Sequence, residues 1–148
     1  MLAPLFPELE AALPEGVALF RAHLNEREQC AILDDISEVM REAPPYRPLM
    51  PMGARMINAI TNCGQWGWHS DARGYRYVDA NPNTQTKWPA IPPRLDTLAR
   101  GLADEAGAKG FVPDACLVNL YAGDGKLKMG ALLAMDPTWE AVKAGQPG

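Results

Sequence analysis

The chain has few cysteines, few histidines and no long apolar run. Its three cysteines, Cys30, Cys63 and Cys116, are odd in number and lack a Cys-x-x-Cys pair, so neither a disulfide framework nor a zinc site is indicated. No apolar stretch approaches the roughly 18 residues that a membrane span needs. The first residues also lack the basic start of a secretory signal. We expect a cytoplasmic protein with no membrane partner, and we expect it to be a monomer.

Positive charge is also scarce. The net charge of −4 argues against a strongly basic nucleic-acid binder, because the phosphate backbone rewards clustered lysine and arginine. A local basic strip is still possible around Arg73, Arg76, Lys126 and Lys128. With 148 residues and 47% apolar content, the chain can bury a single core, so one domain or part of one is expected.

Two amphipathic helices are predicted, and together with the predicted strands they indicate an α+β fold. The first follows Asn25, which forms a capping-box pattern with Glu28, and it should end near Glu42. The second should begin at Pro93, a residue suited to a first helical turn, and stop at Gly107 or Gly110. Their apolar stripes are Ile32, Ile36, Val39 and Met40 in the first helix and Leu95, Leu98 and Leu102 in the second.

Strands are predicted at 17–20, 55–61 and 115–121, and glycines at 64, 67 and 74 allow tight turns between short strands. Residues 1–16 carry three prolines and are interpreted as an irregular arm. The polar stretch 79–89 predicts a surface loop.

Residues 59–77 carry the most specific pattern. This stretch holds two of the four tryptophans and three glycines, within the motifs TNCG (61–64), GW (67–68) and GYRY (74–77). Two further motifs follow, KWPAIP (87–92) and PDACLVNLYA (113–122). Together they resemble the AlkB family of iron(II)- and 2-oxoglutarate-dependent dioxygenases, which remove alkyl groups from nucleic-acid bases. The resemblance covers about residues 17–126.

The resemblance implies a substrate site for alkylated single-stranded DNA or RNA. It implies that Trp68 stacks on the target base, that Tyr75, Arg76 and Tyr77 contact the strand, and that Met56 forms an apolar wall. The alternatives are that Trp68 and Met56 are core residues and that the tyrosines stabilise a hairpin. His69 and Asp71 lie close to Trp68 in the sequence, and His69 is interpreted as a solvated residue of a polar loop.

The resemblance also implies a cofactor site. Asn119 and Tyr121 lie two apart on a predicted strand, so their side chains share one face. In the family this Asn-x-Tyr pattern binds 2-oxoglutarate, here with Leu120 between the two residues. The alternative is that the asparagine and the tyrosine are buried and satisfy neighbouring polar groups. Cys116 is interpreted as a small buried apolar residue.

The iron ligands of the family have no counterpart. The oxygen chemistry needs two histidines and one carboxylate, but the chain has only His23 and His69, and no arginine follows Arg100 to pair with 2-oxoglutarate. We therefore expect Fe(II) and 2-oxoglutarate, the cofactors of the intact family, not to bind stably. Residues 127–148 match no family motif and are predicted to form a short helix that starts at Asp136.

Three hypotheses follow. In the first, residues 17–126 are the N-terminal recognition region and first core strand of a double-stranded β-helix (jelly-roll) dioxygenase. Most of the β-helix core is then absent, and the chain, truncated or frame-shifted, is inactive alone. In the second, the chain is a non-catalytic module that binds nucleotides or single-stranded nucleic acid. In the third, it is a poorly folded remnant, because half a β-helix leaves strand edges unpaired.

Overall fold

A computed structural model describes residues 13–121 of the chain. These residues fall into two units, residues 13–23 and the residues from Leu24 onward. All regular elements belong to the second unit. The predicted 127–148 helix and most of the 1–16 arm lie outside the described residues, and the predicted domain boundaries stay predictions.

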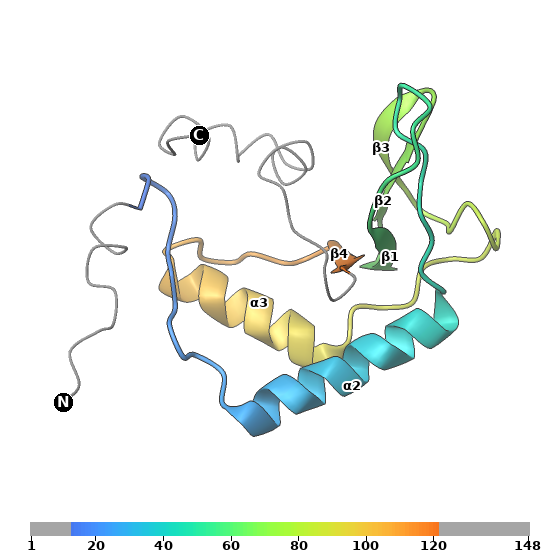
Figure 1. Cartoon of the computed structure of the whole chain (residues 1–148). Coiled ribbons are helices and arrows are strands. Elements are labelled where there is room, and N and C mark those ends of the chain that lie inside the picture. The colour runs from blue at the N-terminus through green and yellow to red at the C-terminus, as the bar shows by residue number, and fades with distance from the viewer. Residues whose placement is uncertain (1–12, 122–148) are drawn as a thin grey trace. The chain divides into compact units, whose positions relative to one another are not determined.

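Both predicted helices are present, and Figure 1 shows them side by side. Helix α2 spans Glu26–Glu42 and begins with a complete capping box, because Asn25 and Glu28 each accept a hydrogen bond from the other's backbone N–H. Helix α3 spans Pro93–Glu105. An ion pair of 3.0 Å between Arg94 Nε and Asp35 Oδ2 connects the two helices.

The strands form two separate antiparallel pairs. Strand β1 (Ala59–Gly64) pairs with β4 (Ala115–Leu120), although some fifty residues separate them in sequence. Strand β2 (Gly67–Asp71) pairs with β3 (Gly74–Val78) in a tight hairpin. Gly74 closes its turn with a φ of +105°, a conformation that a residue with a Cβ rarely adopts.

The buried core is small and lies around β1. Thr61, which has no exposed surface, donates from its hydroxyl to the Ala43 carbonyl at 2.6 Å and so joins β1 to the end of α2. The most deeply buried apolar side chains are Val39, Ala43, Met56, Ile60, Cys63, Trp68 and Trp88. Neither described helix is long and apolar enough to cross a membrane.

Two strand predictions need correction, whereas the predicted surface loop is present. Residues 17–20 form no strand among the described residues, and Val17 and Leu19 are 38% and 46% exposed. The strand predicted at 55–61 starts at residue 59, since the preceding backbone makes isolated bridges. The 79–89 stretch is indeed irregular, but it is anchored to the core by Asn81 and Trp88, which are 1% and 6% exposed.

Candidate nucleic-acid interface

Asn62 fixes the start of the β2–β3 hairpin. Its side-chain oxygen accepts from the Trp68 backbone N–H at 2.9 Å, and its side-chain nitrogen donates to the Trp68 carbonyl at 3.0 Å. Asn62 is 1% exposed, so both bonds are shielded from water. The asparagine of the TNCG motif therefore positions the tryptophan of the GW motif. The sequence alone offered no signal for this role beyond the motif itself.

One face of the hairpin is aromatic. The β2–β3 register places Trp68 opposite Tyr77 and Ser70 opposite Tyr75, so these four side chains lie on the same face. The rings of Trp68 and Tyr75 are stacked, with centroids 5.5 Å apart and planes inclined by 26°. Trp68 is only 3% exposed, whereas Tyr75 and Tyr77 are 46% and 58% exposed. The surface that this face offers to a partner is therefore made mainly by the tyrosines.

The other face of the hairpin is charged. Arg76 donates from both terminal nitrogens to the Asp71 carboxylate, at 2.7 and 2.6 Å, and these bonds hold the pKa of Asp71 well below its usual range. The guanidinium predicted to contact the strand is thus paired within the protein. A terminal nitrogen of Arg73 lies 3.7 Å from Asp71 Oδ2, and the Arg73 side chain is 80% exposed. Arg73 is therefore more accessible to an anionic partner than Arg76.

His69 is a buried strand residue, contrary to the expectation of a solvated loop residue. It is 9% exposed, and its Nδ1 lies 3.0 Å from the hydroxyl of Tyr46. Burial raises the pKa of Tyr46 to about 12, so the phenol keeps its proton and can donate it to Nδ1. Burial, assisted by the charge of Arg76, lowers the pKa of His69. The imidazole is therefore neutral at pH 7.

Met56 lies just before β1 and is buried, with 9% of its surface exposed. Its backbone N–H donates to the Pro48 carbonyl at 2.9 Å, and its carbonyl accepts from Arg47 Nε at 2.7 Å. These bonds fix the backbone of Met56, and its role as an apolar wall stays a prediction.

The predicted cofactor residues lie at the end of β4. The side-chain oxygen of Asn119 accepts from Asn58 Nδ2 at 2.8 Å, which leaves the Asn119 amide hydrogens free to donate elsewhere. Leu120 is half-buried, and Tyr121 is 41% exposed. The amide and the phenol are both suited to the oxygens of a small dicarboxylate.

Cys116, which was expected to be a small buried apolar residue, is half-buried. It lies directly opposite Cys63 in the β1–β4 register, and the Cys63 thiol donates a hydrogen bond to it. This bond lowers the pKa of Cys116, while the same bond and burial raise the pKa of Cys63. The pairing is invisible in the sequence, where 52 residues separate the two cysteines.

The residues present do not fit an iron site of the 2-His-1-carboxylate type. His69 is held by Tyr46, and its Nε2 lies 3.7 Å from Asp71 Oδ2. No group of three histidine, cysteine, aspartate or glutamate side chains with metal-binding spacing occurs among residues 13–121. The rest of the chain adds no histidine.

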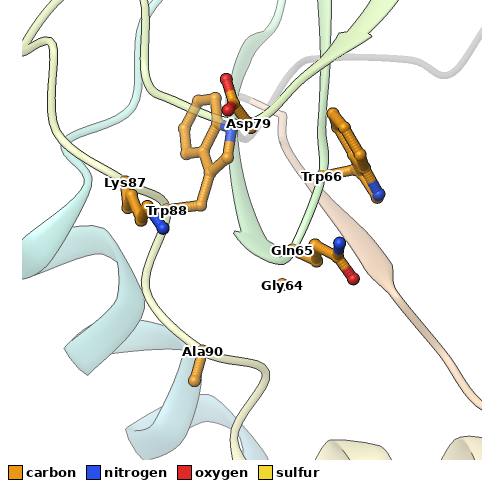
Figure 2. Close-up of a pocket in the computed structure, with 7 residues that line it drawn as sticks. All are labelled: Gly64, Gln65, Trp66, Asp79, Lys87, Trp88 and Ala90. Atoms are coloured by element: carbon orange, nitrogen blue, oxygen red, sulfur yellow. The ribbon is translucent and has the colours of Figure 1, made fainter.

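A hollow that sequence reasoning missed lies at the start of β2 (Figure 2). It measures about 390 Å³, and none of the predicted site residues lines it. Its lining residues are Gly64, Gln65, Trp66, Asp79, Lys87, Trp88 and Ala90. The KWPAIP motif pointed to Lys87 and Trp88, but nothing in the sequence indicated that Trp66, rather than Trp68, exposes its ring.

Comparison with known proteins agrees with the motifs. The profile of the 2OG-Fe(II) oxygenase superfamily matches residues 16–131. The chain is 36% identical over 129 residues to the alpha-ketoglutarate-dependent dioxygenase AlkB of Escherichia coli, covering 87% of this chain and 59% of that protein. The AlkB of Salmonella typhimurium is 38% identical over 123 residues, covering 83% of this chain and 56% of that protein. The AlkB homolog of Caulobacter vibrioides is 39% identical over 106 residues, or 72% of this chain and 46% of that protein. The chain thus spans somewhat more than half the length of the first two of these relatives.

Proposed function

This chain belongs to the AlkB family of the 2OG-Fe(II) oxygenase superfamily, and from that membership we propose that its β2–β3 hairpin binds an alkylated base of single-stranded DNA or RNA. The described residues then form the recognition part of a double-stranded β-helix dioxygenase. Their proposed task is to select and hold the base.

The stacking of Tyr75 on Trp68 is the observation that supports this proposal best. An aromatic ring already lies 5.5 Å from the indole, at an inclination of 26°, in an arrangement that a stacked base would also adopt. Tyr75 is 46% exposed and sits on the outer strand of the hairpin, so it can leave without opening the core. We infer that the target base displaces Tyr75 from Trp68 and that the tyrosine hydroxyl then meets the backbone of the strand.

The positions of Asn119 and Tyr121 are compatible with a role in binding 2-oxoglutarate. Because Asn58 occupies the Asn119 oxygen, the donor side of the amide is turned toward other partners. A carboxylate or keto oxygen accepts from such donors. Stable binding, however, depends on a metal and an arginine whose family positions this chain does not supply, so we assign recognition to this chain and not oxidation.

Fluorescence anisotropy with a labelled pentanucleotide tests the recognition role. The central base is a methylated adenine, and DNA and RNA forms are compared with their unmethylated counterparts. Trp68→Ala should raise the Kd for the methylated strand by about 5- to 150-fold, the range expected for one stacked base. Because Trp68 is buried, Trp68→Phe serves as the variant that preserves packing, and it should weaken binding less.

The control is Phe111→Ala, which removes a 48% exposed ring outside the hairpin and should leave the Kd unchanged. Absence of binding at low salt, or equal affinities for wild type and both Trp68 variants, would reject the proposal.

A second candidate function is a binding module without catalysis, and the misfit to iron favours it. Incubation of the purified 148-residue protein with Fe(II), ascorbate, 2-oxoglutarate and the methylated strand tests whether this chain catalyses oxidation by itself. We expect no succinate above the protein-free control. Succinate formation that depends on the protein would show that the chain is a complete oxidant and would remove this candidate.

A further inference from the structure

The hollow beside Trp66 is preformed. Trp88 makes one wall: it is 6% exposed, and its Nε1 donates to the Val78 carbonyl at 3.0 Å. Its ring lies so close to Gly67 that a Cβ there would come within 2.3 Å of Trp88 Cε2. The backbone N–H of Gly64 donates to Pro89 at 2.8 Å. The wall is thus fixed by hydrogen bonds and by close packing.

Trp66 also lines the hollow and carries an exposed indole on a fixed backbone. Trp66 donates from its backbone N–H to the Asp114 carbonyl at 3.0 Å, yet 38% of its surface is exposed. Both Trp66 and Trp88 line the hollow; in Figure 2 the Lys87 side chain lies near Trp88, and Trp66 lies on the other side of the strands. An exposed indole is suited to stacking against a flat ligand.

The polar groups of the hollow are unpaired. In the part of the chain that the structure describes, no ion pair or side-chain hydrogen bond engages Gln65, Asp79 or Lys87. They offer an amide, a carboxylate and an ammonium group around one aromatic wall. Protein interfaces deplete lysine and aspartate at their centres, whereas small-ligand pockets combine aromatic walls with a few polar groups and have volumes of roughly 300 to 1,000 Å³. The composition and size therefore favour a small planar ligand over a protein partner.

Resting on the proposed function, we propose that this hollow holds an unpaired nucleobase next to the target base in the bound strand. The base stacks on Trp66. Asp79 accepts from an exocyclic amine, as carboxylates do with the N4 amine of cytosine, and Lys87 pairs with a backbone phosphate. Trp66 and Trp68 are two residues apart in extended chain, at most about 7 Å between their Cα atoms, a separation that neighbouring nucleotides of a single strand can span. This hollow would make the protein read the base beside the lesion.

A double-mutant cycle between protein and nucleic acid tests this assignment on the full chain. The probes are the methylated pentanucleotide and two versions of it in which the 5′ or the 3′ neighbour of the methylated base is replaced by an abasic site. Trp66→Ala should raise the Kd for the intact strand by about 5- to 150-fold. It should change nothing for the version whose abasic site removes the base from the hollow. Trp66→Phe should restore most of the affinity, and Phe111→Ala should match wild type.

The outcomes separate the two proposals. If Trp68→Ala weakens binding but Trp66→Ala does not, the target-base role stands and the assignment of the hollow is overturned. If Trp66→Ala weakens the intact strand and both abasic strands equally, Trp66 holds no base and the assignment is again overturned. If no strand binds to wild type, both proposals fail. Loss of affinity in Lys87→Met for every strand, with a shallower salt dependence, would support the phosphate contact.

Discussion

Asn62 and Trp68 lie in different sheets and are joined by two hydrogen bonds that use the side chain of the first and the backbone of the second. The Asn62 side chain thus supplies the two hydrogen bonds to the Trp68 backbone that a neighbouring strand would otherwise supply. It places the tryptophan that the family resemblance assigns to the target base, and it adds to the two other side-chain anchors of the hairpin, the Trp88 bond to Val78 and the Tyr46 bond to His69.

Asn62→Ala should lower the free energy of unfolding by about 2 to 5 kcal/mol, because it leaves a buried N–H and a buried carbonyl of Trp68 without partners. Urea denaturation followed by tryptophan fluorescence measures this change. The matched control is Asn83→Ala in an exposed loop, where a change within about 0.5 kcal/mol is expected. Equal midpoints for the two variants would show that the amide contributes no stability.

Gly67→Ala should also destabilise the protein, by about 1 to 3 kcal/mol, because the new methyl group overlaps the ring of Trp88. Gly101→Ala is the control, since it adds a Cβ with nothing within 4 Å on the exposed side of α3. This second change should stabilise the protein by about 0.5 to 1 kcal/mol, as alanine does in helices. Opposite signs of the two shifts in urea midpoint are the expected result, and a shift of the same sign would contradict the packing argument.

Cys116 should react with iodoacetamide at a lower pH than an ordinary thiol. The thiolate is the reactive form, and the hydrogen bond from Cys63 lowers the pKa of Cys116. The rate at which Cys116 is labelled should therefore rise at a pH below about 8.5, the pKa of an ordinary thiol. Cys63 should stay unmodified in the folded protein, since it has no exposed surface. Mass spectrometry of peptides after timed labelling gives both profiles. Replacement of Cys63 by alanine should shift the Cys116 profile to higher pH, and an unchanged profile would show that the hydrogen bond has no effect.

His69 should make the protein less stable in mild acid. Its pKa is lowered in the folded state, so below pH 6.5, its ordinary value, the unfolded chain binds more protons than the folded one. Stability is therefore fully present above pH 6.5 and is lost as the pH falls toward the folded pKa. Urea midpoints measured at pH 7.5, 6.5 and 5.5 should fall in wild type and fall less in His69→Gln. Parallel declines in both proteins would assign the acid sensitivity to other groups.

Local signals predicted the helices well. The capping box at Asn25 and Glu28 and the proline at 93 act within a few residues, and both helices begin where those residues place them. The failed strand at 17–20 shows the limit of such signals. An apolar run of four becomes a strand only when another strand is available to pair with it, and that information is not local.

The candidate site was predictable as a set of motifs but not as a geometry. The resemblance identified Trp68, Tyr75 and Asn119, yet the covering of Trp68 by Tyr75 and the bond between Asn58 and Asn119 depend on strand register. The pairing of Arg76 with Asp71 likewise follows from their places on one hairpin face. Pairings of this kind come from the fold, because each member is ordinary in its own sequence context.

The two-stranded sheets share no ladder, but the aromatic hairpin is joined to the rest of the core at several points: by the Asn62 amide, by the Trp66 backbone bond to Asp114 and by the Trp88 bond to Val78. A force on the hairpin is therefore shared among these bonds, so that the loss of any one of them should loosen the hairpin without releasing it from the β1–β4 pair.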